Sequence, residues 1–415
     1  MTTKARDEIV RLDKRHVWHP YTSIDAWEAT DPIVVARAEG ATLVDADGTR
    51  YLDGNSSWYT ATLGHGHPRI LRALREQSET LAHVALAGIT HAPAADLASH
   101  LVAVAPRGLN HVFYTDNGST AIEVAIKIAV QRSKRTRFLA LDGAFHGDTV
   151  GATSLGGVEV FKRPFAGVLF DCVHAMEHIC EIVHREKDAL AAVVVEPIVQ
   201  AVDGMRLYPP ALLRDLRAVT AEHGVLLVAD EVFTGYGRTG PMWACEHAGI
   251  TPDVMCIGKA MAAPIPMGAT LVTDRVYDDF RGGKEKTLLY GHTFCGNPLG
   301  AAVAREVLAV YRDEEVLERA RPKARKIEAA FAELAKVPGV AAVRTLGMIG
   351  AADLAGASGY LGSTGWKVYE EAKKRGAYMR PLGDTVYLTP PLVISDEDLD
   401  RLLEVLHASV RAALS

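Results

Sequence analysis

The sequence has few of the features that would place a protein outside the cell or in a membrane. No apolar run reaches the roughly 18 residues needed for a membrane span, and the first 15 residues are too polar for a secretory signal. The 5 cysteines include no C-x-x-C pair, so neither a disulfide framework nor a zinc site is expected. The net charge of −6 gives no reason to expect nucleic-acid binding. These absences favour a protein of the reducing cytoplasm without a membrane or nucleic-acid partner.

The composition present is that of a large globular protein. The chain has 415 residues, of which 48% are hydrophobic and 23% charged, and this length predicts one large domain with a smaller one. Short apolar strands alternate with helices from about residue 69, which predicts an α/β domain with a mostly parallel sheet. The predicted strands are 111–114, 137–141, 191–195, 225–229, 254–257 and 269–272, and the clearest helices are 119–132 and 210–223.

Both ends of the chain have a different pattern. Residues 6–12 predict a short helix and residues 33–53 a small antiparallel unit. A helical pattern from 299 to about 334, strands near 340–346 and 385–388, and a final helix from 397 predict a smaller α+β domain. We therefore expect a large domain at 69–300 and a small domain made of both chain ends, 1–68 and 301–415.

Two predicted strands are each followed by a residue that could take part in catalysis. Asp230 follows the apolar run 225–229, and Lys259 follows the run 254–257. Because ligands bind beyond the carboxyl ends of parallel strands, a carboxylate and an amine are expected at one rim. That pair suits pyridoxal phosphate, where a lysine forms a Schiff base and an aspartate keeps the pyridine nitrogen protonated. The alternative for Lys259 is an exposed lysine that begins a helix.

Two further stretches follow strand ends. Residues 116–120, which include Gly118 and Ser119, open a helix whose free N–H groups and hydroxyls would hold a phosphate. Thr120 and Glu123 have capping-box spacing, so an ordinary helix cap is the alternative. Phe145 follows the strand 137–141 and could stack on a flat ring, or could be a core aromatic.

Three other patterns are set aside. Gly235, Gly237 and Gly240 match a dinucleotide fingerprint, but four residues separate them from the strand and Pro241 follows. No G-x-x-x-x-G-K-[ST] loop occurs, which argues against a phosphate-loop ATPase. His65 and His67 could suggest a metal site, but they lie in a turn-like stretch, so they are not predicted to bind a metal.

Taken together these motifs resemble the class III, fold-type I pyridoxal-phosphate aminotransferases. The resemblance is carried by residues 230–240 with Lys259 and by residues 291–299, and it extends from about 16 to 395. It implies a homodimer with its active site at the interface, and it implies the following roles. The phosphate would be bound by Gly118 and Ser119 and by His292 and Thr293 of the neighbouring subunit; the ring would lie between Phe145 and Val232; Asp230 would pair with the ring nitrogen; and Lys259 would carry the cofactor.

The two chain ends resemble one branch of that family, the adenosylmethionine–8-amino-7-oxononanoate aminotransferases of biotin biosynthesis. Residues 16–21, 56–59, 380–382 and 387–391 carry this likeness. It implies transfer of an amino group from S-adenosylmethionine to 8-amino-7-oxononanoate, giving 7,8-diaminononanoate by ping-pong kinetics through pyridoxamine phosphate. The implied substrate-binding residues are Tyr21, Trp58, Phe145, Gly291 and Arg380, of which Arg380 would hold the substrate carboxylate.

Three departures from that branch leave the amino donor open. Phe145 stands where the branch usually has tyrosine, Phe233 replaces a small residue, and the loop 264–268 is closer to the general family pattern. The alternative is a class III enzyme that moves amino groups from ω-amino acids or diamines to pyruvate or 2-oxoglutarate. A non-catalytic binding protein on the same fold is a further alternative, and a nucleotide-binding enzyme without pyridoxal phosphate is a third.

Overall fold

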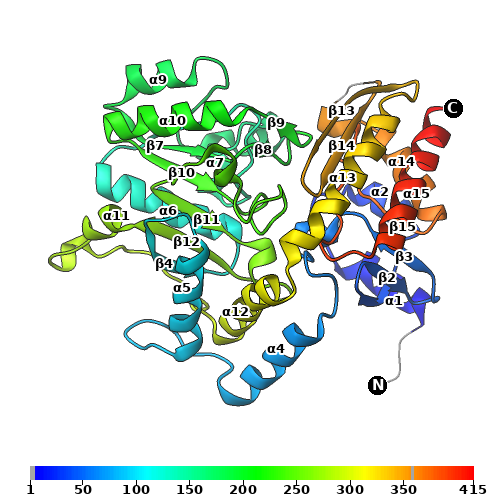
Figure 1. Ribbon diagram of the computed structural model, residues 1–415, viewed down its shortest axis with the longest axis horizontal. Coiled ribbons are helices and arrows are strands. Elements are labelled where there is room, and N and C mark those ends of the chain that lie inside the picture. Colours follow the sequence, from blue (N-terminus) through cyan, green and yellow to red (C-terminus); the bar gives the residue numbers. More distant parts are fainter. Residues whose placement is uncertain (1–4, 357–358) are drawn as a thin grey trace.

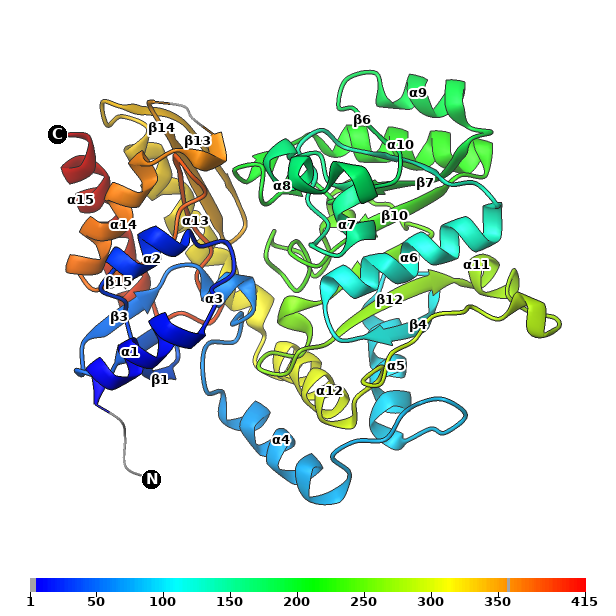
Figure 2. The same cartoon turned by 180° about the vertical axis from the view of Figure 1, so that it is seen from behind.

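The computed structural model describes residues 5–356 and 359–415, which form two lobes side by side (Figures 1 and 2). The larger lobe contains a seven-stranded sheet in the order β4-β12-β11-β10-β7-β5-β6. Strand β12 runs antiparallel to both of its neighbours, and the remaining strands run parallel to one another. The predicted α/β fold with a mostly parallel sheet is confirmed. The strands are β4 (Leu109–Thr115), β5 (Arg137–Ala140), β6 (Cys172–His174), β7 (Leu190–Val195), β10 (Leu226–Asp230), β11 (Val254–Ile257) and β12 (Gly268–Thr273).

Helices bury both faces of this sheet, which explains why its central strands are apolar throughout. Side chains that alternate along β7 point to opposite faces: Val194 packs in the cluster with α6, whereas Val193 packs in the cluster with α9 and α10. The helices of this lobe are α4 (Pro68–Thr80), α5 (Ala92–Val104), α6 (Gly118–Ser133), α7 (Val150–Leu155), α8 (Glu159–Lys162), α9 (Ile179–Glu186), α10 (Pro210–His223) and α11 (Asp274–Asp278). A hairpin of β8 (Val199–Gln200) and β9 (Arg206–Leu207) lies beside them.

The smaller lobe is built from both ends of the chain. Its four-stranded sheet has the order β1-β2-β3-β15, and β15, from near the C-terminus, pairs in parallel with β3 through Ala377 and Leu52. A second sheet has the order β13-β14-β16. The strands are β1 (Val35–Glu39), β2 (Thr42–Asp45), β3 (Arg50–Asp53), β13 (Val340–Leu346), β14 (Ile349–Leu354), β15 (Ala377–Tyr378) and β16 (Thr385–Leu388). The helices are α1 (Arg6–His16), α2 (Ile24–Ala29), α3 (Ser56–Tyr59), α13 (Val316–Leu334), α14 (Thr364–Lys374) and α15 (Asp396–Leu414).

Helix α12 (Pro298–Asp313) joins the lobes, and it packs against α4 and α5. The helical pattern predicted from 299 to 334 is two helices, because Glu315 has a φ of +49° and breaks it between α12 and α13. Strand β6, an edge strand of three residues, was not predicted. The division at residues 69–300 stays a prediction, and its second boundary falls within α12.

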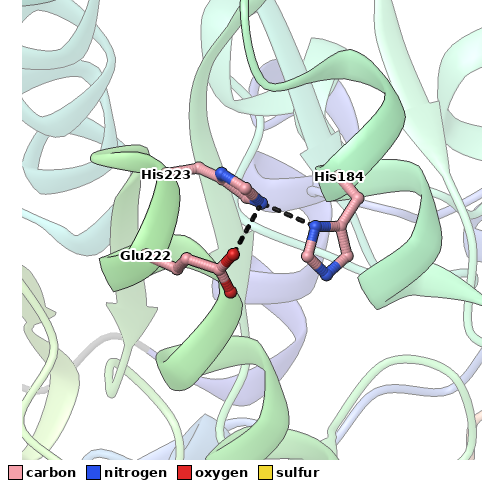
Figure 3. A group of neighbouring side chains, drawn as sticks. All are labelled: His184, Glu222 and His223. Atoms are coloured by element: carbon pink, nitrogen blue, oxygen red, sulfur yellow. Dashed lines mark hydrogen bonds and ion pairs between the residues drawn. The ribbon is translucent and has the colours of Figure 1, made fainter.

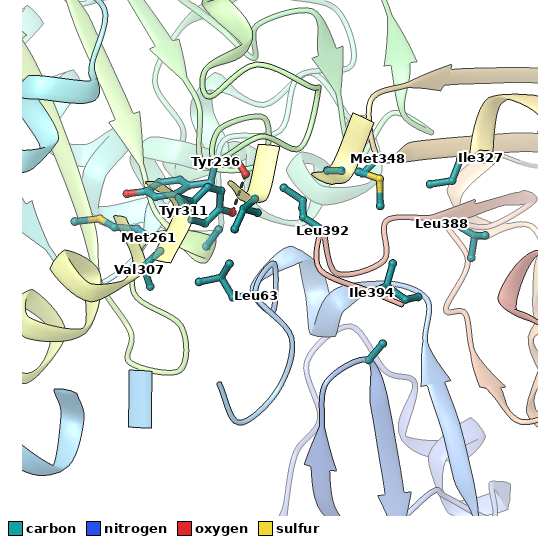
Figure 4. Close-up of a cluster of buried hydrophobic side chains, with 14 of the residues drawn as sticks. Leu63, Tyr236, Met261, Val307, Tyr311, Ile327, Met348, Leu388, Leu392 and Ile394 are labelled. Carbon is teal, nitrogen blue, oxygen red and sulfur yellow. Dashed lines mark hydrogen bonds between the residues drawn. The ribbon is translucent and has the colours of Figure 1, made fainter. Parts of the chain in front are cut away.

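One hydrophobic cluster continues from the larger lobe into the smaller one (Figure 4). Tyr311 of α12 donates a hydrogen bond to the carbonyl of Tyr236 at 2.9 Å, and Leu392 and Ile394 follow from the C-terminal segment. This shared core holds the two lobes together. In the described part of the chain, we find no helix whose length and hydropathy would suit a membrane span, and the cytoplasmic location stays a prediction.

The shared core also tests the packing of α13. Phe331 is fully buried, and a Cβ added to Gly350 of β14 would lie 2.3 Å from its ring. We predict that Phe331→Ala leaves a cavity and costs about 3–5 kcal/mol of stability, measured as a shift in urea unfolding. Phe165→Ala is the control, because Phe165 is 55% exposed and its loss is expected to cost about 0.5 kcal/mol or less. Equal losses in both variants would contradict this account.

Candidate active site

A cavity of about 460 Å³ lies where the carboxyl ends of the central strands meet the smaller lobe. Side chains from both lobes line it, and most of that lining is apolar. The cavity brings together nine of the predicted site residues: Tyr21, Trp58, Gly118, Ser119, Phe145, Asp230, Val232, Lys259 and Arg380.

The register of two parallel strands places Asp230 beside Lys259. Asp230 is the last residue of β10 and pairs with Cys256 of β11, so Lys259 follows just beyond the same edge. The backbone of Lys259 has a φ of +47°, and this turn directs the chain from the strand into the pocket. Both groups therefore reach one cavity because both strands end there.

Lys259 lies in apolar surroundings. Its Nζ is 5.1 Å from the ring centroid of Tyr59 and 5.9 Å from that of Phe233, and it has no hydrogen bond or ion pair with any residue the structure describes. Burial lowers the pKa of Lys259, and the charges of Asp230 and Glu196 offset this only in part. An amine with a lowered pKa is neutral more of the time, so it can attack a carbonyl carbon.

The carboxylate of Asp230 has two hydrogen-bond partners. Its Oδ2 is 2.7 Å from Nδ1 of His146, and its Oδ1 accepts a hydrogen bond from the N–H of Val232 at 3.1 Å. Burial lowers the pKa of His146, but the hydrogen bond to Asp230 and its charge outweigh burial, so the pKa is raised overall. Nδ1 of His146 therefore donates to the carboxylate and fixes its position. The sequence motif 145–147 was interpreted only through Phe145, so this role of His146 was missed.

The start of α6, where a phosphate is expected to bind, lines the cavity, and its cap differs from the one predicted. Asn117 is the N-cap, since its Oδ1 accepts from the N–H of Thr120 at 2.9 Å. The capping box joins Asn117 to Thr120, so the predicted pair of Thr120 with Glu123 is wrong: the helix begins at Gly118, which makes Thr120 its third residue. The N–H groups of Gly118 and Ser119 have no acceptor within the helix, because they lie in its first turn.

Glycine is required at the start of α6 by close packing. A Cβ on Gly118 would lie 2.6 Å from Cγ1 of Val232, the residue that follows the Asp230 edge of the sheet. The missing side chain lets the helix start approach that edge, so its free N–H groups open into the cavity. A positive helix end with two free donors suits a phosphate group.

Arg380 lies between two indole rings. Its guanidinium carbon is 5.3 Å from the ring of Trp58 and 5.4 Å from the ring of Trp366. Its backbone N–H donates to Oδ1 of Asn55 at 2.6 Å, which fixes the segment against the N-terminal part of the chain. Among the described residues no carboxylate lies within ion-pair distance of the guanidinium. Arg380 therefore presents a positioned, unpaired positive charge to the cavity.

The turn that carries Trp58 has an unusual backbone. Residues 56–59 all have left-handed φ values, from +45° to +73°, a conformation that costs L-residues roughly 1–2 kcal/mol each. Ser56 Oγ donates to the carbonyl of Thr389 at 2.6 Å, and Ser57 Oγ donates to Asp53 at 2.8 Å. These bonds hold a turn that places Trp58 on Arg380 and Tyr59 beside Lys259.

An aromatic wall, formed by Tyr21, Phe161, Tyr360 and Phe145, closes another side of the cavity. The ring of Phe161 is 5.6 Å from Tyr21, 4.8 Å from Tyr360 and 5.7 Å from Phe145, all edge-on. The Tyr21 hydroxyl donates to Asp148. Sequence reasoning missed Phe161 and Tyr360, because no motif surrounds them and only the folded chain brings them to the cavity. It also missed Trp366, which contacts Arg380.

Phe233, which differs from its family branch, has a packing role. It is 6% exposed and its ring meets Tyr59 edge-on at 4.6 Å. It therefore forms an apolar wall next to the Lys259 amine.

Three predicted residues lie outside the cavity of the single chain. Gly291 and Thr293 are exposed, and Nε2 of His292 is 3.7 Å from the Asp116 carboxylate, which does line the cavity. Their roles in cofactor and substrate binding stay predictions.

Comparison with known proteins identifies the family. The family model described as aminotransferase class III matches residues 23–410. The adenosylmethionine-8-amino-7-oxononanoate aminotransferase of Nitratidesulfovibrio vulgaris is 39% identical, over 97% of this chain and 81% of that protein. The crystal structure of the enzyme of that name from Methanocaldococcus jannaschii has a TM-score of 0.96 at 31% identity, covering 98% of this chain and 99% of that one. An (S)-enantioselective ω-transaminase from Thermomicrobium roseum has a TM-score of 0.94 at 28% identity, with both chains fully covered.

The chain belongs to the class III aminotransferases, which depend on pyridoxal phosphate. Its own residues fit that cofactor. An amine without a polar partner, a carboxylate paired with a histidine, and a glycine-dependent seat of free N–H groups all open into one cavity. The buried Nε2 of His146 also lacks a partner among the described residues.

The position of the Lys259 amine in the cavity leads to a prediction for its removal. Lys259→Ala is expected to keep the fold and to lose turnover, because no other lysine lines the cavity among the described residues. The measurements are circular dichroism, steady-state rate and the visible absorbance of cofactor bound to lysine, which should disappear. Lys284→Ala, at an exposed lysine, is the control and should keep both signals. A Lys259→Ala protein that still turned over without added amine would rule out this assignment.

Proposed function

We propose that this aminotransferase converts 8-amino-7-oxononanoate to 7,8-diaminononanoate, a step of biotin biosynthesis, with S-adenosylmethionine as the amino donor. The observation that carries the proposal is the unpaired Arg380 guanidinium, stacked between two indole rings at an otherwise apolar cavity. A long keto acid offers one carboxylate for that guanidinium and an aliphatic chain for the apolar walls. Relatives that cover nearly the whole chain carry the corresponding name.

The residues at the strand ends hold the cofactor and move the proton. Gly118 and Ser119 line the cavity and would bind the phosphate through their backbone N–H groups, and Phe145 and Val232, which also line it, would pack against the ring. Asp230, hydrogen-bonded to His146, would pair with the ring nitrogen and keep it protonated. Pyridoxal phosphate, when bound, accepts the electron pair left when the donor loses its α-proton.

Lys259 is the base in this scheme. Its Nζ would take the proton from the α-carbon of the amino donor and pass it to the cofactor. In the second half-reaction it would move a proton from the cofactor to the former carbonyl carbon of the keto acid. The lowered pKa of Lys259 suits a group that must be neutral to accept that proton. Tyr59 and Phe233 place aromatic rings beside the amine, so these neighbours offer it no hydrogen-bond partner.

One cavity must bind two different molecules in turn, which implies ping-pong kinetics. The aromatic wall suits the proposed donor, since a sulfonium cation and a flat adenine both bind well against aromatic rings. Phe161, Tyr360 and Tyr21 supply these rings. An ω-amino acid without a second cation would use little of this wall.

We predict that Arg380→Met raises the KM for 8-amino-7-oxononanoate about 10–150-fold, because a charge-assisted hydrogen bond is lost. The test compares the keto acid with its neutral carboxamide, using S-adenosylmethionine as donor. The wild type should prefer the acid, and Arg380→Met should accept both alike.

The same assay includes its controls. Arg344→Met changes an arginine whose guanidinium is already paired with Asp353, and it should keep the preference for the acid. A wild type that ignored the carboxylate, or that used ω-amino acids and not S-adenosylmethionine, would overturn the proposed function.

We further propose that the enzyme is a homodimer whose sites each use residues of both chains. Gly291, His292 and Thr293 support this, since they lie outside the cavity of one chain although His292 approaches the cavity residue Asp116. In this arrangement Thr293 of one chain reaches the phosphate bound to the other. Gly291 contributes to the same substrate site.

Mixing two inactive variants tests this arrangement. Thr293→Asp should repel the phosphate, and Lys259→Ala lacks the amine. Heterodimers of the two contain one intact site, so co-expression should restore about a quarter of the wild-type activity. Asp230→Asn with Lys259→Ala is the matched control and should restore none, because both residues belong to the same side of every site. No recovery with the first pair would contradict a shared site.

A further inference from the structure

A group of three potential metal ligands lies on two helices of the larger lobe, α9 and α10 (Figures 1 and 3). His184 belongs to α9, and Glu222 and His223 end α10. Nε2 of His223 is 2.6 Å from Nδ1 of His184 and 3.8 Å from Oε1 of Glu222. The three ligand atoms all lie within 4.8 Å of one another. None of these residues lines the cavity.

The packing of the two helices fixes this arrangement. Ile179 and Val183 of α9 and Leu216 and Val219 of α10 are buried in the same cluster against the sheet. The next positions outward are His184 on one helix and the last turn of the other, which stops at Gly224 with a φ of +64°. The backbones are thus held by the core, while Glu222 stays 63% exposed and His223 15% exposed in their side chains.

We propose that His184, Glu222 and His223 bind one zinc ion that links α9 to α10. Two imidazole nitrogens and a carboxylate oxygen are the ligands that zinc takes in sites with an open position, where water completes the tetrahedron. Calcium and magnesium prefer oxygen ligands and would not favour the histidine pair. His184 and His223 come from different helices and are 39 positions apart in the chain. No short sequence motif therefore marks the site.

The distances allow the ion after a small movement. Two nitrogens bound to one tetrahedral zinc are about 3.3 Å apart, whereas His184 and His223 are now 2.6 Å apart and share a hydrogen bond. Their rings are nearly perpendicular, at 77°, so a slight rotation of the more exposed His184 opens the gap. The hydrogen bond between the two nitrogens is then replaced by their coordination of the zinc ion.

The chain contains a matched control for this site. His178 and Glu181, at the other end of α9, form a pair at 3.0 Å. They expose one imidazole and one carboxylate on the same helix, but no second imidazole faces them among the described residues. This pair therefore offers one imidazole and one carboxylate, but lacks the second imidazole of the proposed site.

The test uses the full-length enzyme with its cofactor, freed of metal by a chelator and titrated with zinc by calorimetry. The wild type and His178→Ala should each bind one zinc per chain with the same affinity. His184→Ala and His223→Ala should each lose this binding, while keeping the circular dichroism spectrum and turnover of the wild type. Zinc should also raise the unfolding temperature of the wild type by about 1–4 °C, and not that of His184→Ala.

Two results would overturn the proposal. One is a wild type that takes up no zinc at tens of micromolar, roughly the weakest range in which a three-ligand site would be useful. The other is zinc uptake that persists in the His184→Ala, His223→Ala double variant, or that His178→Ala removes equally, because the ion would then be bound elsewhere.

Discussion

The parallel pairing of β10 with β11 is the constraint on which the site depends. Since Asp230 stands opposite Cys256, the carboxylate and the Lys259 amine leave the sheet at one edge and in one direction. The neighbouring strands add to that edge in the same way: β4 leads into Gly118, and β5 leads to His146. A one-residue slip of any of these strands would turn its side chains to the other face. The chemistry of the enzyme is therefore a consequence of sheet register.

The surroundings of the Asp230 carboxylate and the Lys259 amine differ in their hydrogen-bond partners. Asp230 is buried and hydrogen-bonded to His146, whereas Lys259 lies beside aromatic rings, and desolvation lowers its pKa. Both groups meet the same low-dielectric surroundings, but among the described residues only the carboxylate has a side-chain hydrogen-bond partner. Around Trp58 the protein accepts backbone strain, and hydrogen bonds from Ser56 and Ser57 offset part of its cost.

Sequence reasoning reached those features that local pattern determines. Apolar runs bounded by turns located the central strands, and the residues just past their ends, such as Asp230 and Lys259, line one cavity. It failed where tertiary contact decides. Thr120 lies third in its helix because Asn117 caps it. Phe161 reaches the cavity, and Trp366 reaches Arg380, only because distant segments pack together. The three-residue strand β6 is too short to carry a periodic signal.

The joining of the two chain ends has a consequence for synthesis on the ribosome. Ser56 is held by Thr389, 333 residues later, and β3 must wait for β15 to cover it. At typical translation speeds of about 5–20 residues per second, this delay is roughly 15–70 s. During that time β1, β2 and β3 present an unpaired strand edge, which is a template for pairing with other chains. Slow synthesis near the C-terminus should thus lower the yield of this enzyme more than slow synthesis near its start, and chaperones that shield strand edges should restore it.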